Sequence, residues 1–186
     1  MLVKTHNNKF AALVIAVILV LGLTLPACAA AVPEPELSFE ATKYKNAEHG
    51  FSVYHPAAWE GTEEPELGPT VVYAAGDPGE PPLPAMVIDV LEGDTFADTL
   101  TAALEGGGAE NVKIFTETET TLRDGTPAIE AEGAFSNPAV PLPLDAFWLG
   151  AKKDGTWTFV TVITIDAIAP FDAELFSEIA HTLLLE

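Results

Sequence analysis

Two Asp-Gly dipeptides in the second half of the chain constrain its fold more than any other feature. Asp124-Gly125 lies between alternating runs at 112–122 and 127–135, and Asp154-Gly155 lies between runs at 144–152 and 156–165. Asp-Gly supplies the positive φ angles that tight hairpin turns require. The same device used twice in succession predicts an antiparallel meander.

The run at 156–165 predicts the central strand, because it is apolar on both faces. Trp157 and Phe159 share one face, and Val160 and Val162 share the other. A strand of this kind is covered by other elements on both sides. Further strands are predicted between Gly50 and Pro56, at 70–75 and at 85–91, and loops at 60–69 and 137–143.

Two helices are predicted from apolar residues at helical spacing. Phe96, Leu100 and Leu104 follow a Thr95 cap and end at the glycines 106–108. A last helix opens at Pro170, with a stripe formed by Leu175, Ile179 and Leu183. The fold class is therefore α+β, with an antiparallel sheet of about six to seven strands flanked by helices.

The first 28 residues have the pattern of an export signal. Lys4 and Lys9 precede an uncharged apolar run from Phe10 to Leu25, which Pro26 ends. The run falls short of the ~20 apolar residues that a spanning helix needs. We therefore expect a cleaved signal peptide over 1–28 rather than a permanent span.

Cys28 is the only cysteine in the chain, so it has no partner for an internal disulfide. Its context, Leu25-Pro26-Ala27-Cys28, resembles the bacterial lipobox, which implies a lipidated cysteine at the mature N-terminus. Ala27-Cys28-Ala29 also satisfies the A-x-A rule for ordinary cleavage, which remains an alternative. We expect lipidation of Cys28, and thus a chain exported and anchored to the extracytoplasmic side of a bacterial membrane.

Residues 29–43 are rich in Pro, Glu and Ala and predict a flexible tether. The residues that follow, 44–186, suit one domain by the usual length prior.

Charge limits the partners of the exported chain. All 28 acidic residues follow Cys28, together with six of the eight Lys and Arg, which gives a formal charge of −22. This charge repels nucleic acid, so no nucleic-acid partner is expected. Cationic, neutral or metal-bearing partners remain, and solubility alone would also account for the charge.

One short motif resembles a known family. Tyr44-x-Asn46, then Gly50-Phe51-Ser52-Val53 with Pro56, then Trp59 is similar to the opening hairpin of PsbP-like domains. That superfamily includes many bacterial lipoproteins. The resemblance implies an α/β/α sandwich over 44–186 and carries over no catalytic residues.

No catalytic residue and no cofactor are predicted. The chain contains no phosphate loop, no G-x-S-x-G, no H-E-x-x-H and no calcium-loop spacing.

Four carboxylates are the candidate metal ligands. Glu117 and Glu119 lie on one predicted strand, and Glu130 and Glu132 lie on the strand expected to pair with it. If they line one surface, their oxygens suit Ca²⁺. His49 and His55, with Glu48, form a cruder metal pair, while exposed histidines on a hairpin edge are the simpler interpretation. His181 is assigned a structural role near the end of the last helix.

The loops 76–84 and 137–143, with Trp59 and Trp148 as possible neighbours, are candidates for an aromatic, proline-rich contact surface. Simple capping of the sheet by these loops is the alternative.

The function expected from these features is a non-catalytic binding or assembly accessory of an envelope complex, anchored by its lipid and meeting an envelope protein partner. Two alternatives stay open: a small-ligand or Ca-binding surface protein, and a hydrolase with a site not visible in sequence. A pocket with convergent polar groups would favour these alternatives.

Overall fold

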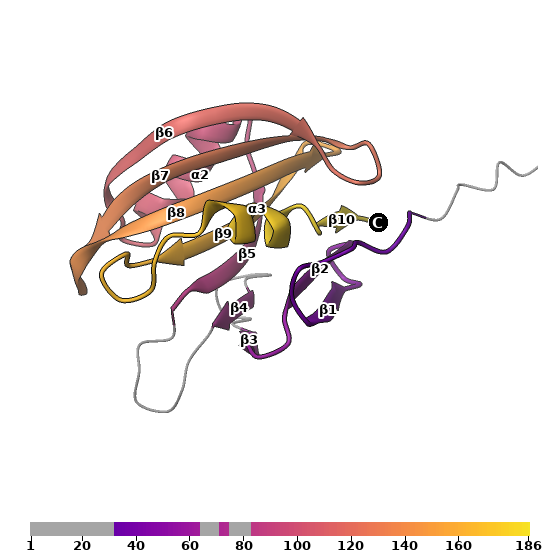
Figure 1. Ribbon diagram of the computed structural model, residues 1–186. Helices are drawn as coiled ribbons and strands as arrows, with labels where there is room; N and C mark the ends of the chain where they lie inside the picture. Colours follow the sequence, from indigo (N-terminus) through magenta and orange to yellow (C-terminus); the bar gives the residue numbers. More distant parts are fainter. Residues whose placement is uncertain (1–31, 64–70, 75–82) are drawn as a thin grey trace, which may run out of the picture. The chain divides into compact units, whose positions relative to one another are not determined.

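The computed structural model describes residues 32–63, 71–74 and 83–186 (Figure 1). Within it, Glu34–Glu186 is a compact unit. The apolar run, Cys28 and residues 29–31 of the tether lie outside the described residues, as do 64–70 and 75–82 of the loops predicted around the strand at 70–75.

Seven strands form the large sheet, in the order β3-β4-β5-β9-β8-β7-β6, and every neighbouring pair is antiparallel. The strands are β3 (Glu60–Glu63), β4 (Val71–Ala74), β5 (Ala85–Glu92), β6 (Glu110–Thr121), β7 (Pro127–Asn137), β8 (Val140–Lys153) and β9 (Thr156–Thr164). The predicted sheet is confirmed, and β9 occupies its centre as expected.

The two Asp-Gly turns differ in length. At the β8–β9 turn, Lys153 pairs with Thr156, and Asp154 and Gly155 both have positive φ, 52° and 89°. That is a two-residue turn.

At the β6–β7 turn, Leu122 N donates to Thr126 O (2.8 Å), so three residues, 123–125, connect the strands. Only Gly125 there has positive φ, 85°. This geometry is the three-residue hairpin with a left-handed glycine. Both predicted Asp-Gly hairpins and the meander are confirmed, but the two turns are not identical, and the extra residue at the β6–β7 turn shifts the register of that pair.

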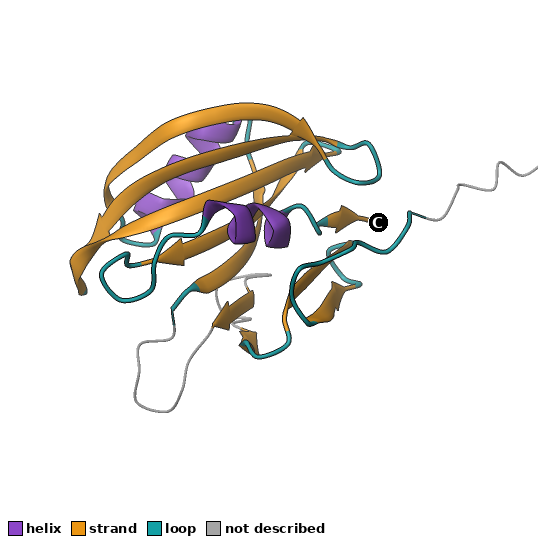
Figure 2. Ribbon diagram, in the orientation of Figure 1, coloured by secondary structure: helices purple, strands orange, loops and turns teal. Residues whose placement is uncertain are grey.

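Helix α2 (Phe96–Gly106) covers one face of the large sheet (Figure 2). Thr95 caps it as predicted, because its side chain accepts from Asp98 N (3.3 Å). Phe96 packs on Trp157 and Phe159, with ring centroids 5.9 and 5.5 Å away. The buried residues of this side also include Leu100, Ala131, Phe135, Leu144, Ala146, Trp148 and Ile165.

The opposite face is covered by helix α3 (Ala173–Ala180) and a small antiparallel sheet, in the order β1-β2-β10. Its strands are β1 (Ala41–Asn46), β2 (Phe51–Pro56) and β10 (Leu184–Leu185). The buried residues here include Phe51, Val53, Met86, Ile88, Phe147, Leu149, Val160, Val162, Phe176 and Ile179. Helices on both faces of an antiparallel sheet confirm the α+β sandwich.

The last helix is shorter than predicted at both ends. Pro170 lies before it, and Asp172 is the N-cap, accepting from Leu175 N (3.0 Å). The helix ends at Ala180, so Leu183 lies beyond it, and the chain then forms β10 against β2. The apolar residues after Ala180 are buried by strand pairing rather than by a further helical turn.

The folded unit begins before the predicted boundary at Tyr44. Strand β1 starts at Ala41, and Ser38 is held to the Glu178 carboxylate of α3 by its backbone N–H and its hydroxyl. Phe39 packs against the buried cluster. The end of the predicted tether is therefore part of the fold.

Two of the predicted loops contain strands. Glu60–Glu63 forms β3, which is polar and lies at a sheet edge, where charged side chains are tolerated. Pro141 and Pro143 lie within β8, which begins at Val140. The β7–β8 register is irregular between the pairs Phe135–Leu144 and Asn137–Val140, and both prolines lie in this interval. The N–H groups that the prolines lack therefore cost few hydrogen bonds between the strands.

Among the described residues, no helix is both long and apolar enough to cross a membrane.

Candidate functional site

The four candidate calcium ligands do not converge. Glu117 pairs with Ala131 and Glu119 with Ile129, whereas Glu130 and Glu132 pair with Thr118 and Thr116. Residues directly opposite in an antiparallel pair share a face. Glu117 and Glu119 therefore lie on one face of the sheet, and Glu130 and Glu132 lie on the other. The prediction of a shared Ca²⁺-binding surface is wrong. The three-residue turn causes this, because a one-residue slip turns every side chain to the other face.

The two histidines flanking β2 do not form a metal pair. His49 is exposed in the β1–β2 turn, whereas His55 is buried near the far end of β2. The four steps from Phe51 to His55 alone span about 13 Å of strand. Within the described ranges, no group of three or more His, Cys, Asp or Glu is placed to hold a metal ion.

His55 should make the stability of the fold depend on pH. Burial lowers its pKa below the ordinary value of 6.5, and the hydrogen bond with the Pro56 carbonyl (2.9 Å) partly opposes this. The folded state keeps His55 neutral, whereas the unfolded chain protonates it below about pH 6.5. The stabilisation is therefore present above that pH and is lost as pH falls toward the folded pKa.

We expect His55→Gln to flatten the fall in unfolding free energy between pH 7.5 and 5.5, measured by urea denaturation. His49→Gln, at an exposed position, is the control and should retain the wild-type slope. Equal slopes for His55→Gln and the wild type would contradict the assignment.

His181 has the structural role that the sequence predicts. It is the C-cap of α3, and its Nε2 lies 2.9 Å from Glu130 Oε2. This contact joins α3 to β7. Glu130, one of the four candidate metal ligands, is therefore bound to His181 instead.

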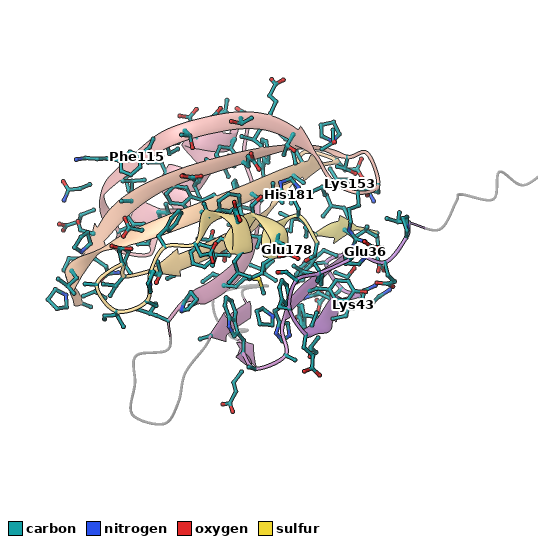
Figure 3. The ribbon with its side chains drawn as sticks, viewed as in Figure 1. Glu36, Lys43, Phe115, Lys153, Glu178 and His181 are labelled. Carbon is teal, nitrogen blue, oxygen red and sulfur yellow. The ribbon has the colours of Figure 1, made fainter. Side chains whose placement is uncertain are left out.

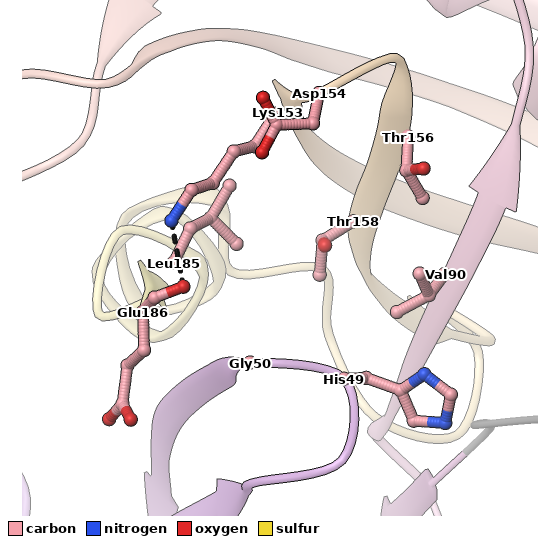
Figure 4. A pocket seen from close by; sticks show the side chains of 9 residues that line it. All are labelled: His49, Gly50, Val90, Lys153, Asp154, Thr156, Thr158, Leu185 and Glu186. Carbon is pink, nitrogen blue, oxygen red and sulfur yellow. Dashed lines mark hydrogen bonds between the residues drawn. The ribbon is translucent and has the colours of Figure 1, made fainter.

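A small polar hollow lies between the β1–β2 turn, the β8–β9 turn and β10 (Figure 4). Its volume is about 190 Å³, and Lys153 Nζ donates to Glu186 O across its wall (2.7 Å). Lys45 also pairs with the Glu186 side chain. The hollow is smaller than ordinary ligand pockets of about 300–1,000 Å³.

A larger groove lies where β7 and β9 end and where β5 and β8 begin. Its volume is about 550 Å³. The described residues that line it are Leu83, Ala85, Phe135, Asn137, Ala139, Val140, Pro141, Leu144, Ile163, Ile165 and Ile168. None of these is charged, in a chain of formal charge −20. Ile168 is 47% exposed at the rim. We call this feature the apolar groove.

A second cavity of about 480 Å³ lies between α2 and the sheet. It shares Phe135 and Asn137 with the apolar groove. Leu100 and Leu104 of α2 cover it, and Asp89 and Thr161 are polar residues on its floor. The two spaces therefore adjoin along β7.

A third hollow, about 270 Å³, lies on the α3 side of the sheet. Its wall contains the carboxylates of Glu132, Asp145 and Asp166 and the rings of Phe115 and Phe171. We call it the acidic hollow.

The tryptophans expected in the predicted contact surface are not part of it, and contact of the loops with a partner stays a prediction. Trp59 and Trp148 are buried, on opposite sides of the large sheet, so neither reaches a surface. The segment 137–143, however, supplies Asn137, Val140 and Pro141 to the apolar groove.

Comparison with solved structures identifies the fold. The solution structure of cyanobacterial PsbP (CyanoP) from Synechocystis sp. PCC 6803 matches with a TM-score of 0.57 over 78% of this chain and 92% of that chain, at 12% identity. The chain has a PsbP-like fold. The fold implied by the Tyr44-to-Trp59 motif is thus confirmed.

A second match, to the Pseudomonas aeruginosa protein PA94, titled a putative regulator of unknown function, covers 79% of this chain and 98% of that one at 18% identity. Its TM-score of 0.44 is too low to add an argument about the PsbP-like fold. The chain matches no protein-family model and no curated protein sequence.

Proposed function

We propose that the protein is an exported lipoprotein, anchored through Cys28 to the extracytoplasmic side of a bacterial membrane, that binds a protein partner of an envelope complex without catalysing a reaction. The apolar groove is the observation that carries this proposal. A hollow with no charged side chain among its described lining residues and with Ile168 exposed, on a chain so acidic, is typical of an interaction site.

The short connection to Cys28 supports a partner close to the membrane. Ser38 is fixed to α3 through Glu178. Ser38 lies ten positions after Cys28, and an extended chain spans at most about 35 Å over that length. A lipid on Cys28 therefore keeps Ser38 within about 35 Å of the membrane surface.

The groove lies clear of the point where the tether joins the folded unit, so this junction does not obstruct a partner that binds there. In Figure 3, Glu36 and Lys43 lie at the end where the folded unit begins, and Phe115 lies at the other end. The β7–β8 turn, beside the groove, is at the same end as Phe115 (Figure 1). The binding surface is therefore away from the attachment of the tether.

Carriage of a small apolar ligand is a second candidate function, which the cavity under α2 favours. Its volume is within the range of ligand pockets, and it adjoins the apolar groove.

Site-specific photo-crosslinking tests the first proposal. A photoreactive amino acid at Ile168 of the full chain, in cells that produce it, should give a discrete adduct with an envelope protein. The same residue at Glu119, exposed on β6, is the matched control and should give none. Val140→Glu, which places a charge in the groove, should abolish the Ile168 adduct.

Cys28→Ala provides the test of the anchor. This variant should lose fatty-acid labelling and membrane retention, and with them most of the Ile168 adduct. Unchanged labelling contradicts lipidation. Equal adducts from Ile168 and Glu119, or no adduct from either, contradict binding through the groove.

A further inference from the structure

The loop 165–172 is a wall shared by the apolar groove and the acidic hollow. Ile165 and Ile168 line the groove, whereas Asp166 and Phe171 of the same loop line the hollow. The adjoining β8 residues divide in the same way, with Leu144 in the groove and Asp145 in the hollow. A ligand that crosses this loop meets both surfaces.

The wall is held in place by its own hydrogen bonds. Ile168 N donates to Ile165 O (2.7 Å), and Thr164 Oγ1 donates to Ala169 O (2.6 Å). Phe171 N donates to Asp166 Oδ1 (3.2 Å). The Phe171 ring also meets Phe176 of α3 edge-on at 5.2 Å. A surface fixed before binding loses little conformational entropy when it is occupied.

The chemistry of the hollow is that of a site for a side-chain cation. Glu132 and Asp145 are diagonal neighbours on β7 and β8, since Glu132 pairs with Phe147 and Asp145 with Ala134. Phe115 lies at an irregularity of the β6 register and is 64% exposed. An aromatic face beside carboxylates suits an arginine or lysine.

The hollow retains a net negative charge. Lys113 of β6 faces the same side, since it pairs with Ala134, but it forms no salt bridge with Glu132 or Asp145 within the described structure. The three carboxylates of the hollow outnumber the single exposed amine of Lys113. A cation from a binding partner can therefore neutralise the remaining negative charge.

We infer that the groove and the hollow together bind one polypeptide segment of the partner, in which aliphatic side chains fill the groove and an arginine or lysine beyond loop 165–172 enters the hollow. This rests on the proposed function and adds the chemistry of the partner. A hydrocarbon chain would leave the hollow empty, and anionic headgroups would be repelled by it.

Peptide binding to charge-matched variants tests the inference. The probe is a labelled synthetic peptide of alternating leucine and arginine, titrated with the soluble folded unit and with the full chain at physiological ionic strength. Glu132→Gln with Asp145→Asn should weaken binding about fivefold, the effect of two half-exposed ion pairs. Glu117→Gln with Glu119→Gln makes the same change in net charge on the opposite face and should have little effect.

A second probe separates the two contacts. A peptide of alternating leucine and glutamine should bind more weakly than the arginine peptide to the wild type, and equally well to the Glu132/Asp145 variant. Thermal unfolding of every variant checks that the fold is intact.

Equal weakening by the two variant pairs would show only general attraction to an acidic chain and would overturn the inference. So would equal affinity for the two peptides, or a dimer in which a second copy covers the groove. An intact Ile168 adduct with any of these results would leave the proposed function standing and remove only the cationic contact.

Discussion

Replacing Gly133 with alanine is expected to lower the free energy of unfolding by about 3 kcal/mol, the upper range for overpacking a core. A Cβ at this position would lie 2.0 Å from the Lys113 carbonyl oxygen and 2.6 Å from Trp148 Cζ3. Neither can withdraw easily, because one belongs to the backbone of β6 and the other to a fully buried ring. Gly133 therefore allows β6 and Trp148 to approach β7 closely.

Urea denaturation of Gly133→Ala measures this effect. Gly106→Ala is the matched control, because nothing lies within 4 Å of a Cβ built there and its φ is not positive. That change stabilises by about 0.5–1 kcal/mol in the middle of a helix, and by less at the last residue of α2, so the control should lose no stability. A loss below about 1 kcal/mol at Gly133 would mean that the β6 bulge adjusts to accept a methyl group.

Phe176→Ala should cost about 3–5 kcal/mol, the usual range for emptying a buried phenylalanine site. The side chain is 1% exposed and joins α3 to the sheet and to Phe171. Because Phe171 belongs to the wall of the acidic hollow, this variant should also weaken binding of the leucine–arginine peptide.

Glu174→Ala, at an exposed position in the first turn of the same helix, is the control and should cost less than about 1 kcal/mol. The two variants are compared by thermal and chemical unfolding. A Phe176→Ala protein as stable as this control would show that α3 is not fixed by its buried face.

The features that the sequence predicted well are governed by local chemistry. The β8–β9 turn, the central position of β9 and the Thr95 cap of α2 each depend on residues close together in the chain. The PsbP-like fold was also recognisable, because the motif from Tyr44 to Trp59 lies within the first hairpin and its continuation.

Features set by distant pairing were not predictable. The sequence of Glu60–Glu63 predicts a loop, but the segment forms a strand because it pairs with β4. Leu184–Leu185 continues a helical pattern in the sequence, but it forms a strand because it pairs with β2. The calcium hypothesis was wrong because the β6–β7 turn is one residue longer than a two-residue turn. A two-residue turn at Asp124-Gly125 would have placed the four glutamates on one face, and the three-residue turn separates them.

The apolar groove and the acidic hollow belong to this second group. Their walls come from β5, β6, β7, β8, β9 and the loop after β9, and no sequence motif links these segments to one another. The proline-rich segment 137–143, which the sequence singled out, supplies part of the groove, whereas the tryptophans expected beside it are buried.

The pairing of β10 with β2 also sets the order of events during folding. Leu184 and Leu185 pair with Ser52 and Phe51, contacts separated by more than 130 residues. Such non-local contacts slow folding, because the intervening chain must be ordered first. The small sheet can be completed only after residues 184–185 have been synthesised, so the edge of β2 that pairs with β10 stays open until then.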